Sequence, residues 1–123
     1  MYYAKKGSGA FKNNVKLPIE RNDDKFIIVA SKSHMSPETE KFIAEVKCSK
    51  SKMLTSVGSS LKLCLVAEGK ADLYPRLGPT MEWDTAAAHA IVLESGKRVV
   101  RYDTKKPLIY NKENLLNPWF IVE

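Results

Sequence analysis

The sequence predicts an α/β protein built on a mixed, largely parallel sheet with helices on both faces. Residues 26–30 form a short continuous apolar run, β-branched at Ile27, Ile28 and Val29, which is typical of a strand buried on both faces of a sheet. Along the rest of the chain, short apolar runs alternate with segments of helical spacing. Helices of that length serve as the crossover connections that parallel strands require.

The N-terminal residues predict a β-hairpin. The apolar Tyr2-Tyr3-Ala4 leads directly into a Lys-Gly-Ser-Gly turn. An apolar start of this kind is more typical of the interior of a domain than of a domain end. The polar segment 12–24 that follows is predicted to be a surface loop and not a boundary between domains.

Ser36-Pro37 predicts the start of the first helix. Ser36 can accept a hydrogen bond from the first free amides of a helix, and Pro37 suits the first helical position. Phe42, Ile43 and Val46 then repeat at helical spacing on one face. A second strand is predicted over residues 53–57.

Two further helices are predicted in the second half of the chain. Leu61, Cys64 and Leu65 indicate a helix that follows Gly58 and ends at Gly69. The next helix is predicted to start around residue 84 and to end at about residue 94, before Gly96. Short apolar runs predict three more strands, over residues 71–75, 99–102 and 120–122.

Composition is consistent with one globular domain spanning residues 1–123. The hydrophobic share of 44% suffices for a core, and no apolar run approaches the roughly 18 residues of a membrane span. Cys48 and Cys64 fit neither a closely spaced metal pair nor a disulfide framework, and Cys64 is expected to be a buried, reduced thiol. We expect a soluble cytoplasmic protein, with a peripheral location on the inner face of the cell membrane as the alternative.

The net charge of +6 favours anionic partners such as nucleic acid, phosphorylated metabolites or acidic protein surfaces. Charge alone does not choose among them. The lysines are scattered along the chain and are not interleaved with aromatic residues, so a nucleic-acid interface is the least favoured reading, and we expect no nucleic-acid partner.

Several motifs, taken together and in order, carry a family resemblance. The longest is residues 58–69, Gly-Ser-Ser-Leu-Lys-Leu-Cys-Leu-Val-Ala-Glu-Gly. The chain resembles the C-terminal half of CysQ-type 3'(2'),5'-bisphosphate nucleotidases, which are members of the inositol monophosphatase superfamily. The other matching stretches are residues 2–12, 31–34, 71–76, 82–87 and 117–120.

The resemblance implies the C-terminal domain of the inositol monophosphatase-like fold. Members of this family carry a metal-binding Glu and an Asp-Pro-(Ile/Leu)-Asp-Gly-Thr segment in an N-terminal half, and neither is found among these 123 residues. The chain is therefore interpreted as one half of an enzyme whose partner is the N-terminal half. By itself it is expected to be inactive or nearly so.

Asp84 is the candidate metal ligand. From the residues alone, an Asp before Thr-Ala-Ala-Ala predicts a helix N-cap. The resemblance implies that the Trp-Asp-x-Ala-Ala segment supplies this carboxylate to a catalytic magnesium ion (Mg2+) and helps to bind substrate. Ala88 stands where the family pattern has Gly, which puts the local packing in doubt.

Four further residues are implied to bind the nucleotide. Ser59 and Lys62 lie three apart at the start of a predicted helix and can project from the same side. A capping serine and a solvated lysine are the plain alternative. His34 follows the predicted buried strand, and Arg76 follows Tyr-Pro; a surface histidine and a turn arginine are their alternatives. His89 is expected to be only packed.

The activity that the resemblance implies is magnesium-dependent hydrolysis of adenosine 3',5'-bisphosphate to AMP, in sulfur assimilation, with the sulfated relative of this nucleotide as a further substrate. Lithium inhibition is implied as well. Three alternatives stay open: an inositol-phosphate phosphatase of the same superfamily, a non-catalytic nucleotide-binding or interaction module, and a nucleic-acid binder, whose affinity would fall steeply with salt.

Overall fold

The computed structural model describes residues 2–21, 24–30, 36–47, 49–55, 61–110 and 112–123. No helix within these ranges is both long and apolar enough to cross a membrane. The elements in chain order are β1 (Tyr2–Lys5), β2 (Gly9–Lys12), β3 (Val15–Lys16), β4 (Lys25–Val29), α1 (Pro37–Glu45), β5 (Ser51–Thr55), α2 (Leu61–Glu68), β6 (Tyr74–Arg76), α3 (Glu82–Glu94), β7 (Val99–Arg101) and β8 (Phe120–Val122).

The main sheet is mixed, as predicted, but among the described strands it is parallel only in part and not for the most part. Strands β4 and β5 are parallel neighbours, whereas β6, β8 and β7 form an antiparallel group in that order. A parallel bridge between Ile28 and Leu73 joins the two groups. Helix α1 supplies the crossover that a parallel β4–β5 pair needs. The parallel half of the sheet is therefore the half that the alternating pattern predicts.

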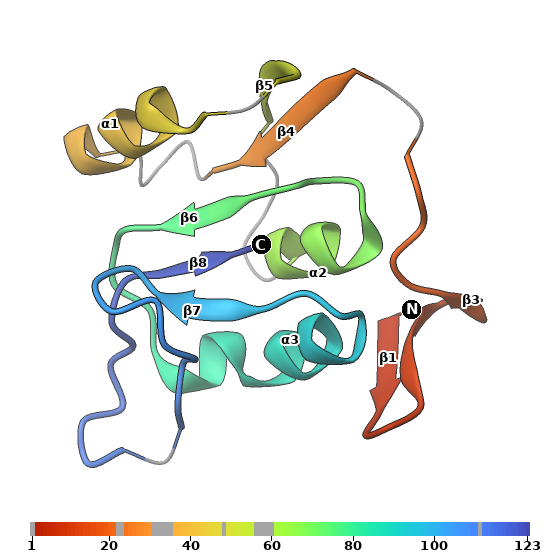
Figure 1. Cartoon of the computed structure of the whole chain (residues 1–123). Helices are drawn as coiled ribbons and strands as arrows, with labels where there is room; N and C mark the ends of the chain where they lie inside the picture. The colour runs from red at the N-terminus through yellow and green to blue at the C-terminus, as the bar shows by residue number, and fades with distance from the viewer. Residues whose placement is uncertain (1, 22–23, 31–35, 48, 56–60, 111) are drawn as a thin grey trace.

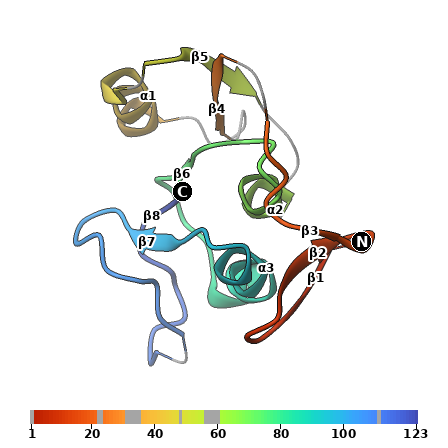
Figure 2. The same cartoon turned by 45° about the vertical axis from the view of Figure 1, so that its right-hand side comes forward.

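Helices cover both faces of the sheet, which confirms the predicted layering (Figures 1 and 2). Successive residues of β4 point to opposite faces. Val29 joins the core cluster that includes residues of α2 and α3, and Ile28 joins the cluster against which Phe42, Ile43 and Val46 pack. The apolar run of β4 is thus buried on two sides because each face has its own helices.

The N-terminal hairpin is confirmed and forms a small sheet of its own with β3. Tyr3 and Phe11 stack on one face of this sheet, with ring centroids 5.3 Å apart. The prediction of a surface loop over residues 12–24 is wrong at its start. The amide of Leu17 donates to the carbonyl of Ala10 at 2.8 Å, and Leu17 is buried, because β3 extends the hairpin ladder.

The strand predicted over residues 71–75 is divided between two partners. The carbonyl of Leu73 accepts a hydrogen bond from the amide of Val29 at 2.9 Å, so this residue pairs with β4. Residues Tyr74–Arg76 pair with β8. Because Leu73 pairs with β4 in parallel, the C-terminal end of β6 lies at the same edge of the sheet as that of β4. Ligands bind at this edge in open α/β sheets.

Helix starts follow the local chemistry in one case and not in another. Ser36 is the N-cap of α1, and its Oγ accepts a hydrogen bond from the amide of Thr39 at 3.2 Å, which confirms that prediction. Helix α3 begins at Glu82, two residues before the predicted start, and its N-cap is Met81. Backbone contacts from a distant segment hold this start, as described below.

Candidate functional site

The candidate site lies where β6 ends and where α2 and α3 begin. Figure 1 shows the two helices side by side, both running in the direction opposite to the arrow of β6. Residues 77–81 connect β6 to α3, so Arg76 and Asp84 lie at the two ends of one short connection. Lys62 lies in the first turn of α2. Three of the predicted site residues therefore come from three adjoining elements.

Asp84 occupies the third position of α3 and is exposed. Its Oδ2 accepts a hydrogen bond from the amide of Met81 at 2.9 Å. The prediction that Asp84 is the N-cap is wrong by position, since Met81 takes that place, but the carboxylate does bond back to the cap. This contact fixes one carboxylate oxygen at a helix N-terminus, where negative charge is favoured.

Lys62 is a buried cation. Its side chain is 3% exposed, and its Nζ lies 5.8 Å from the ring centroid of Tyr74. Burial, and then the positive charge of Arg76, lower the pKa of the Lys62 ammonium. No ion pair of Lys62 with a carboxylate occurs in the part of the chain that the structure describes. The plain alternative of a solvated lysine at position 62 is therefore wrong.

Arg76 is the last residue of β6 and lies close enough to Lys62 to affect its pKa. Its Nη2 donates to the carbonyl of Pro79 at 3.1 Å. Its Nε is buried and has no hydrogen-bond partner within the described ranges. A buried donor without a partner costs free energy unless a ligand satisfies it.

Lys62 and Arg76 together form a cluster of positive charge without a carboxylate counter-ion among the described residues. The first turn of α2 adds its free amides and the positive end of the helix dipole. Such an arrangement favours an anion with several acceptor oxygens. His34 and Ser59, the other predicted nucleotide contacts, lie outside the described residues.

The described part of the chain does not hold a complete metal centre. No group of three His, Cys, Asp or Glu side chains suited to a metal ion is found there. Asp84 fits the role of a single ligand, because its carboxylate is exposed and its oxygens are the donors that hard divalent cations prefer. The remaining ligands of such a centre would have to come from elsewhere.

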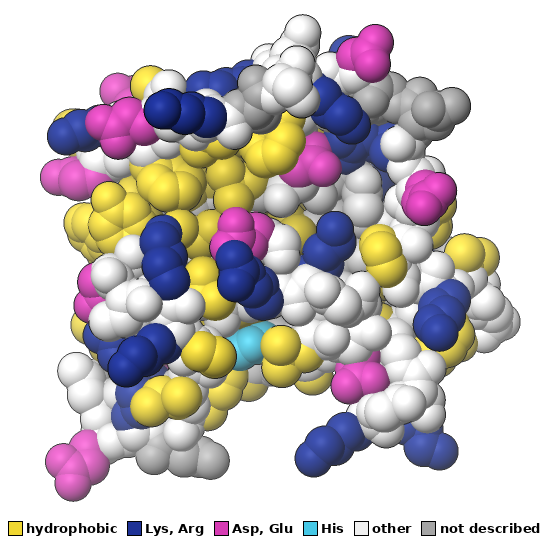
Figure 3. Space-filling model, viewed as in Figure 1, with side chains coloured by type: hydrophobic (Ala, Val, Ile, Leu, Met, Phe, Trp, Pro, Cys, Tyr) yellow, Lys and Arg dark blue, Asp and Glu magenta, His cyan; other side chains and the backbone are white. Residues whose placement is uncertain are grey.

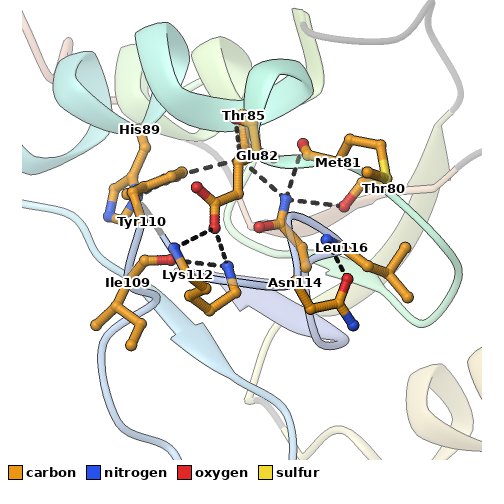
Figure 4. Close-up of polar contacts among 11 residues, drawn as sticks. Thr80, Met81, Glu82, Thr85, His89, Ile109, Tyr110, Lys112, Asn114 and Leu116 are labelled. Carbon is orange, nitrogen blue, oxygen red and sulfur yellow. Dashed lines mark hydrogen bonds and ion pairs between the residues drawn. The ribbon is translucent and has the colours of Figure 1, made fainter.

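The structure contains a buried polar network next to Asp84 that the sequence did not predict (Figure 4). Asn117, Thr85, Tyr110 and His89 are joined by hydrogen bonds from the segment before β8 to one face of α3. His89 is buried as predicted, but its Nδ1 also lies 2.6 Å from the hydroxyl of Tyr110. Burial lowers the pKa of His89 and raises that of Tyr110, which favours the neutral form of both.

Ala88 is buried in the core cluster that α2 and α3 share, so the additional methyl group is packed within the core.

Figure 3 shows Lys and Arg side chains distributed over one face of the molecule and interspersed with Asp and Glu. On that face the positive charge does not form a continuous stripe.

Comparisons with known proteins agree on the relatives of this chain. The model of the inositol monophosphatase family matches residues 1–119. The chain is 42% identical to the 3'(2'),5'-bisphosphate nucleotidase CysQ of Salmonella typhimurium, covering 99% of this chain and 49% of that protein. It is 46% identical over 97 residues to the CysQ protein of Escherichia coli K12, covering 78% of this chain and 38% of that one.

Solved structures of CysQ and of inositol monophosphatases are also similar to this chain. The crystal structure of CysQ from Bacteroides thetaiotaomicron has a TM-score of 0.89 and 48% identity, covering 99% of this chain and 52% of that one. Inositol monophosphatase II of Staphylococcus aureus has a TM-score of 0.75 at 22% identity, which speaks for the fold alone. The chain spans about half the length of the relatives it matches, and it corresponds to the C-terminal part of a CysQ-type protein.

Proposed function

This chain belongs to the inositol monophosphatase family, and from that premise we propose that it forms the C-terminal part of a magnesium-dependent 3'(2'),5'-bisphosphate nucleotidase. The substrate we propose is adenosine 3',5'-bisphosphate, which is hydrolysed to AMP and phosphate. The names of the CysQ relatives support this choice of substrate. The remaining part of the active site would come from an N-terminal half, so the 123-residue chain alone is expected to release no phosphate.

The observation that carries the proposal is the pair of uncompensated cations. Lys62 is buried without a carboxylate partner among the described residues, and Arg76 beside it keeps a buried donor unsatisfied there. Burying like charges together lowers stability, and such a cost is typical of a ligand-binding site. The substrate carries two phosphate groups, and the one that is not hydrolysed supplies the missing negative charge.

In this proposal different residues bind the two ends of the substrate, and four of them bind the end that does not react. Lys62 binds a phosphate as a point charge, and the planar guanidinium of Arg76 grips the same end of the nucleotide with paired donors. His34 and Ser59 are proposed to complete this nucleotide contact. Because this end does not react, the four residues determine which substrate is used and how it is oriented.

Asp84 is proposed to act at the other end of the substrate as a ligand of magnesium. Its contact with the amide of Met81 orients the carboxylate before any ion binds. The chemistry that bound magnesium supplies in such a site is polarisation of the phosphoryl group and a lower pKa of the attacking water. Asp84 itself holds its charge in place and contacts the reacting end of the substrate.

The test requires the complete site. We define the completed enzyme as this chain joined to the N-terminal part of the Bacteroides thetaiotaomicron CysQ protein. Turnover of adenosine 3',5'-bisphosphate is compared with turnover of a small phosphate monoester that lacks adenine and the second phosphate. We expect Lys62→Ala and Arg76→Ala each to lower kcat/KM for the nucleotide by about ten- to a hundredfold, and to change the small ester much less.

Lys47→Ala, at an exposed position after α1, is the matched control and should leave both substrates unaffected. An equal loss on both substrates would show that Lys62 and Arg76 serve the reacting phosphate or the fold. Preferred turnover of inositol phosphate would favour the inositol-phosphatase alternative. Nucleotide binding without turnover would favour a non-catalytic module.

A further inference from the structure

Asn117 is buried against the start of α3, where it contacts Thr80, Met81 and Thr85, which are labelled in Figure 4. Its side chain is 3% exposed. The amide Nδ2 lies within hydrogen-bond distance of Thr80 Oγ1 at 3.1 Å, the carbonyl of Met81 at 3.0 Å and Thr85 Oγ1 at 3.1 Å, and its two hydrogens are shared among these three acceptors. Its backbone amide also donates to the carbonyl of Thr80 at 2.8 Å. One residue therefore binds both sides of the α3 N-cap.

The segment before Asn117 reinforces this contact. The amide of Glu82, at the first position of α3, donates to the carbonyl of Leu115 at 2.9 Å. The Glu82 carboxylate pairs with Lys112, whose backbone amide also donates to it at 3.3 Å. Met81 brings no hydroxyl or carboxylate to the cap position. A segment distant in the sequence thus satisfies helix-start groups that a capping side chain usually serves.

Met81 connects Asn117 to Asp84. Its carbonyl accepts from the Asn117 amide, and its own amide donates to Asp84 Oδ2 at 2.9 Å. Two consecutive hydrogen bonds therefore run from the buried amide to the exposed carboxylate. We propose that Asn117 is a positioning residue, which fixes Met81 and thereby sets the orientation of the Asp84 carboxylate toward a metal ion.

The inference rests on the proposed role of Asp84, and it adds a residue to which no function has been given. The contacts of a ligating carboxylate with its surroundings orient it, and the loss of such a partner costs about 10- to 100-fold in metal affinity. Asn117 acts through Met81 and does not touch the substrate. Its loss should therefore change the magnesium dependence of the reaction and leave the KM for the nucleotide almost unchanged.

Asn117→Leu keeps the size of the side chain and removes the amide that donates to Thr80, Met81 and Thr85. Asn114→Leu is the matched control, because Asn114 is exposed and, among the described residues, accepts the amide of Leu116 within its own segment. Thr80→Val is the milder variant, since it removes one acceptor and preserves shape. If Asn117→Leu fails to fold, Thr80→Val supplies the result, with a smaller shift in the same direction.

The first measurement is hydrogen exchange in the 123-residue chain. In Asn117→Leu, exchange of the amides of Met81 and Glu82 should rise by roughly tenfold, while amides of β4 stay protected. Unchanged exchange at both positions would overturn the inference, whatever the enzyme does.

The second measurement is the magnesium concentration for half-maximal rate in the completed enzyme. It should rise about 10- to 100-fold in Asn117→Leu and stay at the wild-type value in Asn114→Leu. Combined with Asp84→Asn, the Asn117 change should add almost nothing. If Asp84→Asn abolishes magnesium dependence but Asn117→Leu does not shift it, the positioning role is wrong and the proposed function stands. If Asp84→Asn leaves magnesium dependence intact, both fail, because the role of Asp84 itself is wrong.

Discussion

The two ends of α2 each carry a buried charged residue, and the two residues differ in whether the charge has a partner. At its last residue, Glu68 is 2% exposed and is bound by Tyr2, Lys12 and Lys70. In its first turn, Lys62 is equally buried but has no carboxylate partner among the described residues. One helix of eight residues thus carries a fully paired charge and an unpaired one.

The pKa values of the two groups move for different reasons. Burial raises the pKa of the Glu68 carboxyl, but hydrogen bonds from Tyr2, Lys12 and Lys70 outweigh burial and hold this pKa below its usual range. Burial, together with the hydrogen bond to Glu68, raises the pKa of Tyr2 to about 12. At Lys62, burial and the charge of Arg76 both lower the pKa, and nothing opposes them.

The difference separates an anchor from a binding site. The partners of Glu68 lie on the N-terminal hairpin and at the end of α2, so the ion pairs hold that hairpin to the main domain. Lys62 has only the ring of Tyr74 as a favourable neighbour of its charge among the described residues, and its burial without a carboxylate costs free energy. A protein that keeps such a charge gains from it elsewhere, and the binding of an anionic substrate is the gain we propose.

The largest effect is expected at Asp84, in the candidate site that also contains the unpaired Lys62. Asp84→Asn in the completed enzyme should lower kcat on the order of a thousandfold, because the charge that binds the metal is lost. The free energy of unfolding should change by less than about 1 kcal/mol, since the amide oxygen can still accept from Met81. Phosphate release and urea unfolding measure the two effects. A large loss of stability with near-normal turnover would show that Asp84 serves only the helix.

The paired end should respond in the opposite way. Glu68→Gln should lower the free energy of unfolding by about 2 kcal/mol, because a buried acceptor loses its charge while Tyr2 and Lys12 keep their places. The depressed pKa of Glu68 means that its contribution is complete above the pKa of the unfolded chain and is lost as the pH falls through the folded-state pKa. The two proteins should therefore converge in stability in acid. Urea unfolding across that pH range measures it, and a constant difference down to the lowest pH would contradict the assignment.

The smallest effect is expected from Lys62→Met, and its sign sharpens the comparison. Removing an unpaired buried ammonium should raise the free energy of unfolding by about 1 kcal/mol. Because the folded-state pKa of Lys62 is lowered, the wild-type chain should regain this stability as the pH rises through that pKa, and the variant should not. Lys47→Met at an exposed position is the control. Thermal unfolding at neutral and alkaline pH decides the point, and a loss of stability in Lys62→Met would indicate a hidden partner.

Local structure was largely predictable from the chain. The Ser36-Pro37 start of α1 and the buried run of β4 occur as the sequence predicts, because capping chemistry and apolar periodicity act over a few residues. The start of α3 was not predictable in the same way. The amide of Glu82 binds the carbonyl of Leu115, and the carbonyl of Met81 binds Asn117, and neither partner is near Met81 in the sequence.

The candidate site divides along the same line. The sequence by itself determined the order of strands and helices, the family resemblance and the identities of Lys62, Arg76 and Asp84 as candidates. Only the tertiary structure decided that Lys62 is buried beside Arg76 without a carboxylate from the described residues, while Glu68 on the same helix gains three partners. A charge is paired or unpaired according to which elements pack around it. That packing depends on contacts between distant segments, which local patterns do not encode.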